Sequence, residues 1–343
     1  MLLSIIIVNW NVKDLLERCL ASLYRETRNI DFEVIVVDNA SKDGSVEMVK
    51  EKFPQVKLIA NKDNKWFAGG NNQGLAIAKG ELVLLLNPDT EILDGAIEKM
   101  VGIMGIKNEK KNGGHKVKIS NLKLETNNDI GILGCKLLNP DMTLQPSCRR
   151  LPRLSDQILI LLKLHNFFPR LKPVREYYMS DFNYDSTREV EQVMGACLMT
   201  RKEIIDKIGG LDENYGSIFE EVDFCKRALN APITSIKRGI MENKNFFPSE
   251  RGNRGAFFWK IYFTDQAQII HHKGQSFRQK KIITNQKNFN RALLRYFKKY
   301  KLFIEYVIIL ILCPVSMFLA FVDQMMILAG FRGFKAKFKR REF

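Results

Sequence analysis

A chain of 343 residues with 45% hydrophobic and 27% charged residues has the composition of an ordinary globular protein, which excludes a collagenous or a disordered chain. The formal net charge is +16, and residues 107–123 and 331–343 each contribute six Lys or Arg against one Glu, a net +5. Such patches favour an anionic partner, which is a membrane surface, a nucleic acid or a phosphorylated substrate. The six cysteines form no Cys-x-x-Cys pair, so we interpret them as reduced core residues of a cytosolic protein.

The first hundred residues alternate between strand-like and helical patterns, which predicts right-handed βαβ units and a mostly parallel sheet. The amino terminus lacks the basic region and the cleavage site of a signal peptide, so we expect residues 3–8 to form the first strand. A helix capped by Asp14 follows. Three more strands are expected, at 32–37, 56–60 and 82–86. A polar loop over residues 61–74 precedes a helix that ends at Gly80.

Polar side chains follow three of these strands. They are Asn9, Asp38 with Asn39, and Asn87 with Asp89. Because parallel strands bring their carboxyl ends to one edge of a sheet, we expect one crevice lined by all of them. An acidic residue at this edge suits a divalent cation that carries phosphates. The alternative for residues 87–90 is a turn followed by a helix start, since proline fixes φ and Asp or Thr caps helices.

The pattern changes in the second part of the chain. Residues 108–129 are rich in Lys, Asn and Gly, which predicts an inserted surface loop of unknown function. Regular structure resumes at residues 130–138, whereas residues 154–189 mix aromatic, proline and basic side chains without a clear period. Further elements are expected as a strand at 190–200, a helix at 202–208, a helix that follows the acidic stretch 219–223 and ends at Leu229, and a strand at 268–270.

Two polar motifs have a plain structural alternative to a role in binding. The pair His271 and His272 could be structural histidines at the end of a strand. The glycines Gly69 and Gly70 before Asn71 could be a turn and a helix cap. Taken singly, neither motif predicts a function.

The acidic cluster Glu220, Glu221 and Asp223 could likewise be a solvated helix start, where acidic groups favour the helix dipole. In combination with the other motifs, however, the cluster predicts a specific chemistry. A carboxylate and a histidine can hold a metal, a strand-end aspartate can meet a nucleobase or ribose, and an acidic cluster can deprotonate a hydroxyl. Together they describe metal-assisted transfer from a nucleoside diphosphate donor.

Six ordered segments of the chain resemble family 2 glycosyltransferases with a GT-A fold, and more narrowly the bacterial rhamnosyltransferase-like branch that builds cell-surface polysaccharides. They are SIIIVNWNVKDLLERCLASL from Ser4, VIVVDNASKDGS from Val34, NKWFAGGNNQG through LLLNPDT from Asn64, LGCKLLNPDMTLQPSCRR from Leu133, GACLMTRKEIIDKIGGLDENYGSIFEEVDFCKR from Gly195, and HHKGQS from His271. The matches span nearly all of residues 3–300.

The resemblance implies a role for several of the polar positions. Asn9 and Asp38 would contact the nucleotide. The loop from Asn64 to Asn71, with Gly69 and Gly70, would shape the donor site. Residues 87–89 take the place of the family's Asp-x-Asp motif, so Asp89 would bind Mg²⁺ or Mn²⁺ bridging the diphosphate, while Asn87 removes one charge from the motif.

Two further roles follow from the same resemblance. His271 best matches the family's late metal-ligating histidine, with His272 as second choice. Glu221 stands where the family usually has the Asp of a Glu-Asp pair, its general base. Since Glu is one methylene longer than Asp, Asp223 and Glu220 remain alternatives for the base. The resemblance implies inverting displacement, for which one base without a covalent nucleophile suffices.

The carboxy-terminal region contains an uncharged apolar run over residues 306–322. As a helix this run would be about 25 Å long, which is short of the hydrocarbon core of roughly 30 Å. Pro314 lies within the run, and basic residues lie on both sides of it. These features favour a helix or a bent helical pair in the cytoplasmic leaflet, held there by the basic tail. A buried core helix and a true membrane span are the alternatives.

We therefore expect an α/β protein with a mostly parallel, Rossmann-like central sheet flanked by helices. Residues 1–300 would form the GT-A domain, with an insertion at about 106–129, and residues 301–343 a membrane-associating helix and basic tail. The predicted partners are a dTDP- or UDP-linked sugar donor, most simply dTDP-L-rhamnose, a polyprenyl-diphosphate-linked saccharide acceptor and the membrane surface. The protein would be peripheral or monotopic at the cytoplasmic face of the plasma membrane.

Two other functions remain open at this point. One is a sugar-nucleotide nucleotidyltransferase, which uses a related α/β layout, and the other is a non-catalytic GT-A membrane adaptor. The basic early glycine-rich loop of nucleotidyltransferases is missing from the sequence. Nucleic acid is not expected as a partner, because the basic clusters lack interleaved aromatic residues on a β-surface.

Overall fold

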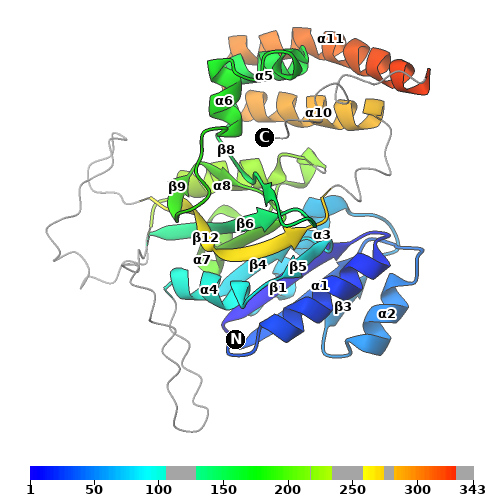
Figure 1. The fold of residues 1–343 in the computed structure, drawn as a ribbon, viewed down its shortest axis with the longest axis vertical. Helices are drawn as coiled ribbons and strands as arrows, with labels where there is room; N and C mark the ends of the chain where they lie inside the picture. The colour runs from blue at the N-terminus through cyan, green and yellow to red at the C-terminus, as the bar shows by residue number, and fades with distance from the viewer. Residues whose placement is uncertain (106–128, 217, 234–257, 274–281, 330–343) are drawn as a thin grey trace, which may run out of the picture.

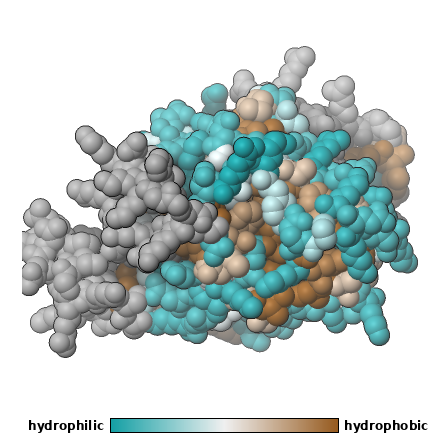
Figure 2. All heavy atoms as spheres, turned by 90° about the horizontal axis from the view of Figure 1, so that it is seen from below, coloured by the Kyte–Doolittle hydropathy of each residue, from teal (hydrophilic) through white to brown (hydrophobic). Residues whose placement is uncertain are grey.

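The computed structural model describes residues 1–105, 129–216, 218–233, 258–273 and 282–329. A central sheet with helices packed against it forms the main body, and helices α10 (Ile282–Tyr300) and α11 (Phe303–Leu328) lie together at one end (Figure 1). The opposite end exposes both hydrophilic and hydrophobic residues (Figure 2). Most of the predicted insertion at 106–129 and all of the tail from 330 onward lie outside the described residues.

The first part of the chain forms the predicted βαβ units. Its strands are β1 (Leu3–Asn9), β2 (Phe32–Asp38), β3 (Lys57–Ala60) and β4 (Leu82–Leu86). Its connecting helices are α1 (Lys13–Glu26), α2 (Ser45–Lys52) and α3 (Trp66–Ile77). The four strands are parallel in the order β3-β2-β1-β4, so their carboxyl ends share one edge of the sheet.

The later strands make the sheet mixed. They are β5 (Thr90–Ile92), β6 (Ile130–Leu138), β7 (Leu144–Gln145), β9 (Arg188–Val190), β11 (Cys197–Arg201) and β12 (Lys260–His271). The order continues from β4 through β11, β6 and β12 to β5. Strands β6 and β12 run with the first four, whereas β5, β7, β9 and β11 run against them, so six of the ten strands share one direction. The predicted α/β class with a mostly parallel sheet is confirmed.

The remaining elements lie around this sheet. The helices are α4 (Ala96–Ile103), α5 (Leu154–Leu161), α6 (Lys172–Tyr178), α7 (Lys202–Ile208) and α8 (Glu220–Leu229), with two 3₁₀ turns, η1 (Leu164–Asn166) and η2 (Glu213–Tyr215). Strands β8 (Cys148–Arg149) and β10 (Gln192–Val193) form a separate antiparallel pair. The predicted strand at 130–138 and the predicted helices at 202–208 and up to Leu229 are confirmed.

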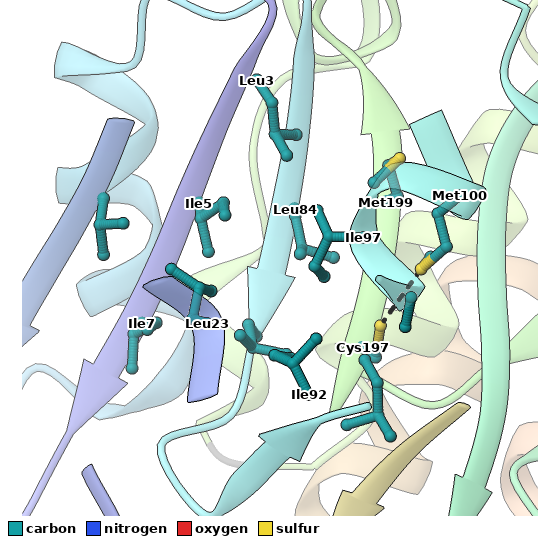
Figure 3. Close-up of a cluster of buried hydrophobic side chains, with 14 of the residues drawn as sticks. Leu3, Ile5, Ile7, Leu23, Leu84, Ile92, Ile97, Met100, Cys197 and Met199 are labelled. Atoms are coloured by element: carbon teal, nitrogen blue, oxygen red, sulfur yellow. Dashed lines mark hydrogen bonds between the residues drawn. The ribbon is translucent and has the colours of Figure 1, made fainter. Parts of the chain in front are cut away.

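Both faces of the sheet are buried, which explains the continuous apolar strands. On β1, Ile5 and Ile7 pack toward α1, α2 and α4, and part of this cluster is drawn in Figure 3. Ile6, on the other face, belongs to a second cluster that contains residues of α3, α7 and α8. All six cysteines are buried, as predicted for core residues.

Several element boundaries were predicted wrongly. The polar segment 61–74 is not a loop, because α3 already begins at Trp66. The helix after β1 is not capped by Asp14, which lies in its first turn after the N-cap residue Val12. The apolar helix near the C-terminus runs from 303 to 328 and, at 26 residues, is about 39 Å long, longer than its uncharged run predicted.

The segment 190–200 is not one strand but the end of β9, the whole of β10 and most of β11. Each piece has a different partner, since β9 pairs with β12, β10 with β8, and β11 with β4 and β6. The short strand predicted at 268–270 is instead the last part of the twelve-residue β12. A local pattern reveals neither a change of partner nor a strand that continues through polar residues.

The glycines of α3 let this helix lie directly on β1. A Cβ atom placed on Gly74 would lie 2.5 Å from Ile6 Cγ2, a distance that real Cβ atoms do not adopt. Close approach therefore outweighs the low helix propensity of glycine, about 1 kcal/mol below alanine. This packing fixes α3 over the edge of the sheet where the polar residues gather.

Replacing Gly74 with alanine is expected to lower the free energy of unfolding by about 1–3 kcal/mol, because the new methyl group would overlap Ile6. Chemical denaturation followed by circular dichroism measures this change. Ile6→Ala removes the overlapping methyl group, so the double variant should lose less stability than the sum of the two single variants. Strictly additive losses would show that the contact is not the cause.

Candidate active site

The strand ends of β1 and β2 hold Asn9 and Asp38 next to each other, as partners in the β1–β2 ladder. Asn9 Nδ2 donates hydrogen bonds to Asp38 Oδ2 at 2.8 Å and to Ser41 Oγ at 3.1 Å. The backbone N–H of Ser41 donates to Asp38 Oδ1 at 2.8 Å. Both Asn9 and Asp38 are buried. The predicted gathering of strand-end residues is therefore present here, and the network holds the Asp38 carboxylate in one orientation.

The start of α3 lies beside these strand ends. Asn64 Oδ1 accepts a hydrogen bond from the Trp66 backbone N–H at 2.8 Å. Gly69 and Gly70 lie inside α3, so the turn-and-cap alternative for them is wrong. A Cβ atom on Gly70 would lie 2.7 Å from Val8 Cγ1, which explains why the helix has glycine where it crosses β1.

Asn71 and Asn39 complete this corner of the site. Asn71 is buried and donates through Nδ2 to the Phe67 carbonyl at 2.8 Å, within its own helix. Asn39, at the end of β2, donates through Nδ2 to the Trp66 carbonyl at 3.0 Å and accepts from Asn61 Nδ2 at 3.0 Å. Asn39 thereby ties the sheet edge to the start of α3.

The pairing of β5 with β12 brings the predicted metal ligands together. His271 is the ladder partner of Thr90, and the His272 backbone N–H donates to the Asp89 carbonyl at 2.8 Å. The side chains of Asp89 and His271 consequently meet, with 3.4 Å between Oδ1 and Nε2. Both are buried, at 7% and 4% exposure. His272, in contrast, is engaged by Glu91, with 2.7 Å between Nε2 and Oε1.

Gln145 fixes the tautomer of His271. Its amide Nε2 donates to Asn139 Oδ1 at 2.8 Å and to the His271 carbonyl at 3.1 Å. Gln145 Oε1 therefore faces His271 Nδ1, at 2.7 Å, and accepts its proton. The lone pair of Nε2 is left on the side of Asp89 and of Asn87, whose Nδ2 lies 3.3 Å away. A histidine held in this way presents the nitrogen that a metal takes.

The donor set suits a cation that obtains other ligands from its substrate. Asp89 supplies carboxylate oxygens and His271 an imidazole nitrogen, a combination that Mn²⁺ accepts. Among the described residues no three or more His, Cys, Asp or Glu side chains form a metal-binding group. Mg²⁺ and Mn²⁺ at phosphate sites are commonly held by one or two protein groups together with water and phosphate oxygens. The pair therefore fits the implied cation as part of a site that a diphosphate completes.

On α8, Asp223 is a structural anchor. It is fully buried and accepts from Arg227 Nε and Lys299 Nζ, both at 2.6 Å, from Tyr300 Oη at 2.7 Å and from Tyr215 Oη at 3.3 Å. Burial raises the pKa of both tyrosines, which keeps their hydroxyl groups protonated as donors. These four contacts occupy both carboxylate oxygens and tie α8 to α10.

Glu221 has a different environment, although it lies on the same helix. It is half-buried, and burial raises the pKa of its carboxyl group above the usual value. A Cβ atom on Gly195 would lie 3.6 Å from Glu221 Cβ and 3.4 Å from Phe67 Cζ, so these side chains flank Gly195. The next residue, Ala196, accepts the backbone N–H of Asn87 at 3.0 Å. Glu221 therefore lies beside the edge that carries Asn87, whereas Glu220 is buried at the start of α8.

Comparison with known proteins shows which proteins this chain is similar to. Residues 4–122 match the model of glycosyl transferase family 2. The N-acetylglucosaminyl-diphospho-decaprenol L-rhamnosyltransferase of Mycobacterium tuberculosis is 24% identical over 286 residues, covering 80% of this chain and 77% of that protein. The match places a family 2 glycosyltransferase region in the first third of the chain, and glycosyltransferases are similar to the chain over most of its length. The predicted family is confirmed, and the similarity to a rhamnosyltransferase supports the predicted branch.

Two other similar proteins are a hexosyltransferase and a mannosyltransferase. The low-salt glycan biosynthesis hexosyltransferase of Haloferax volcanii is 29% identical over 235 residues, covering 67% of this chain and 62% of that protein. The solved structure of a Pyrobaculum calidifontis mannosyltransferase in complex with GDP-Man and Mn²⁺ aligns with a TM-score of 0.49 and 14% identity, covering 96% of this chain and 75% of that one.

The candidate site combines residues inside and outside the matched region. Asn9, Asp38 and Asp89 lie within residues 4–122, whereas Glu221 and His271 come from the later chain. Sequence patterns missed Gln145, whose partner His271 is 126 residues away. The only local signal was a polar residue, Gln145, within the mixed apolar and polar segment that begins at Leu133. Its partner cannot be read from the sequence, because the sheet brings such distant side chains together.

Asp223→Asn is expected to lower the free energy of unfolding by about 2–3 kcal/mol, since it leaves Arg227 and Lys299 without their shared counter-charge. The value is below that of a fully buried pair because Lys299 is 35% exposed and also contacts Asp212. Denaturant unfolding gives the difference. The matched control is Asp206→Asn, which breaks an exposed pair with Lys202 and should change stability by less than about 0.5 kcal/mol. Equal effects of the two variants would contradict the anchoring role.

Proposed function

We propose that this glycosyltransferase moves L-rhamnose from dTDP-L-rhamnose to a polyprenyl-diphosphate-linked saccharide, with inversion at the anomeric carbon. The observation that carries the proposal is the meeting of Asp89 and His271, 3.4 Å apart, on the sheet edge that also holds Asp38. The mycobacterial relative is an L-rhamnosyltransferase named for N-acetylglucosaminyl-diphospho-decaprenol, which supports both the donor and the acceptor class.

The donor nucleotide would lie against the ends of β1 and β2. The Asp38 carboxylate is already fixed by Asn9 and Ser41, so it can accept hydrogen bonds from a base or ribose without first being ordered. The start of α3, from Asn64 to Asn71, would bound the sugar, with its glycines giving room at the strand end. These assignments extend the family resemblance to the contacts of this chain.

The diphosphate would lie next to Asp89 and His271. Mg²⁺ or Mn²⁺ bound by these two residues would neutralise the charge that develops on the leaving diphosphate. Gln145 keeps the Nε2 lone pair of His271 free of a proton on the side of Asp89. Asn87 contributes an amide where a second carboxylate would otherwise repel the phosphates, which moderates the negative charge of the edge.

Glu221 would act as the general base. Its carboxylate would take the proton of the acceptor hydroxyl while the hydroxyl oxygen bonds to the anomeric carbon and the bond from that carbon to the diphosphate oxygen breaks. Asp223 is unsuited to this task because four donors occupy it, and Glu220 is buried. The burial that raises the Glu221 pKa also brings it nearer to the pH at which a base is most effective.

The acceptor's lipid would reach the enzyme at the cytoplasmic face of the membrane, where the protein is held as a peripheral or monotopic protein. Among the described residues, α11 is the one helix long and apolar enough to cross a membrane. One side of it nevertheless packs on α5 and α10, through residues such as Ile309 and Cys313. The other side exposes large apolar side chains, including Phe303, Ile311 and Phe318. This two-sided character favours a helix lying in the membrane surface, with the basic tail drawn to anionic lipid.

The donor and the cation are tested together. With Mn²⁺ present we expect release of dTDP from dTDP-L-rhamnose, and loss of this activity in EDTA or in Asp89→Ala. Gln145→Leu should raise the Mn²⁺ concentration for half-maximal activity by about 10–100-fold, because His271 loses the group that fixes its tautomer. Liquid chromatography of the released nucleotide measures the donor cleavage, its loss without the cation site, and the Mn²⁺ dependence of the Gln145→Leu variant. A UDP-sugar hydrolysed in preference to dTDP-rhamnose would refute the donor assignment, and full activity in EDTA the cation.

Glu221→Gln is expected to reduce sugar transfer by about 10²–10⁴-fold. The fold should persist, since glutamine lacks the charge that burial disfavours. In the unmodified enzyme the rate should rise with pH through the raised pKa of Glu221, because only the ionised carboxylate accepts the proton. Transfer to acceptor at varied pH measures both effects. If Glu221→Gln kept the rate of the unmodified enzyme and the same fall of the rate at low pH, Glu221 would not be the base.

A further inference from the structure

The segment from Gln157 to Arg175 contains no Asp or Glu and carries four basic residues. They are Lys163, Arg170, Lys172 and Arg175. The segment covers most of α5, the turn η1 and the first half of α6, and its sequence pattern predicted no structure. Its charge is thus of one sign over nineteen residues, and this sign attracts anionic groups.

Between η1 and α6, the same segment exposes large apolar side chains. Phe167, Phe168 and Leu171 are 47%, 55% and 42% exposed, within five residues of each other. A single exposed apolar residue is ordinary, whereas a cluster marks a surface that contacts something. We name residues 167–172 the Phe168 loop. In it, exposed aromatic and aliphatic side chains alternate with Arg170 and Lys172, a composition suited to the boundary between acyl chains and charged headgroups.

The Phe168 loop lies at the same end of the molecule as α11. Figure 1 shows α5, α6, α10 and α11 together at this end. Leu161, at the end of α5, packs in one cluster with Ile309 and Cys313 of α11. Just before the loop, Lys163 Nζ donates to Gln286 Oε1 of α10 at 2.5 Å. The loop is therefore attached to the helical pair through both apolar and polar contacts.

The α10–α11 pair has a few buried polar groups beside its apolar interface, and α11 exposes large apolar side chains. Asn290 Nδ2 donates to the Cys313 carbonyl at 3.2 Å, and Ser316 Oγ donates to Asn290 Oδ1 at 3.3 Å. Gln286 Nε2 also donates to Asn290 Oδ1, at 2.8 Å. These residues are buried, while the large side chains of α11 face outward. The exposed apolar face of α11 suits contact with lipid.

We propose that the Phe168 loop is a second membrane-contact segment, which enters an anionic lipid surface beside α11. Phe168 and its apolar neighbours would lie among the upper acyl chains, with Arg170 and Lys172 at the lipid phosphates. The inference deepens the proposed function, on which it rests, because that function places the enzyme at a membrane. One helix lying in a surface leaves the protein free to roll about the helix axis. A second contact to the side of that axis stops the rolling and fixes the direction in which the active site faces.

The charge of the loop decides between the occupants of this surface. The chain's own tail, residues 331–343, carries six basic residues against one acidic residue, so it would be repelled by the equally basic segment. Contact between this surface and the same surface of a second copy would be disfavoured for the same reason, because it brings two basic segments together. An anionic bilayer satisfies both the apolar and the basic side chains.

The test uses the full-length protein and vesicles of phosphatidylcholine with or without phosphatidylglycerol. The double variant Phe168→Ser with Leu171→Ser should weaken binding in vesicle flotation by about tenfold. The matched control is Met142→Ser with Leu144→Ser. It removes side chains that are 54% and 40% exposed, at the turn after β6 and at the first residue of β7, and should bind like the unmodified protein. Unchanged binding by the Phe168 loop variant would overturn the proposal.

Two further measurements separate the remaining outcomes. Arg170→Gln with Lys172→Gln should remove most of the gain that phosphatidylglycerol gives, and retention of the full gain would contradict the headgroup contact. In Phe168→Trp, fluorescence quenching by brominated lipid should exceed that in Met142→Trp, and equal quenching would overturn lipid insertion. Light scattering that shows a dimer broken by the Phe168 loop variant would assign the surface to a second copy instead.

Donor hydrolysis in solution keeps the inference distinct from the proposed function. The Phe168 loop variant should release nucleotide from the sugar donor at the rate of the unmodified enzyme, because none of the candidate site residues lies in the loop. If the unmodified protein hydrolysed no sugar nucleotide but bound vesicles through the loop, the proposed function would fail and the membrane contact would stand. If hydrolysis were intact and the loop variant bound vesicles normally, only the membrane contact would fail.

Discussion

The pairing of β5 with β12 is the constraint on which the site depends. It is a short antiparallel ladder, from Thr90 to Ile92, yet it joins the end of the first βαβ half to the last strand of the sheet. Without it, Asp89 and His271 would have no reason to meet. The ladder is supported from below by α1, where Ser22 Oγ accepts the Ile92 backbone N–H at 3.0 Å. A polar pair inside the protein is thus positioned by backbone hydrogen bonds rather than by its own attraction.

A second constraint links the helical end of the molecule to α8, the helix of the candidate base. Lys299 and Tyr300 of α10 both donate to Asp223 of α8, and Arg295 of α10 pairs with Asp212 at 2.8 Å. Around these bonds, the aromatic side chains of α10 pack on the residues that begin α8. Because Asp223 and Glu221 are two residues apart on one helix, the anchoring carboxylate and the candidate base share their backbone. Within the acidic cluster, the Asp223 carboxylate therefore holds the helix, and the Glu221 carboxylate is the one available for the proposed chemistry.

The sequence predicted the parts of the fold that local patterns determine. The apolar strands β1, β2 and β4 and the polar residues after them followed from burial and from parallel topology. The start of α3 was predicted too late, because Gly70 and Gly74 indicated a loop, whereas their real role is close packing on β1. Gln145 and the anchoring of Asp223 to α10 were missed for another reason. The partner of Gln145 lies 126 residues away, and the α10 partners of Asp223 lie 76 and 77 residues away. Contacts of this kind are products of the tertiary fold and leave no local period.

The rigid bonds between α10 and Asp223 have a consequence for the choice of acceptor. They attach α8 to α10, on which α11 packs, so the distance from Glu221 to the exposed face of α11 is fixed by the fold. On a bilayer, this fixed distance would set how far from the membrane surface the reaction takes place. An acceptor hydroxyl would have to stand at that height to meet the base, and the number of sugars between it and the lipid diphosphate would be selected by reach as well as by shape.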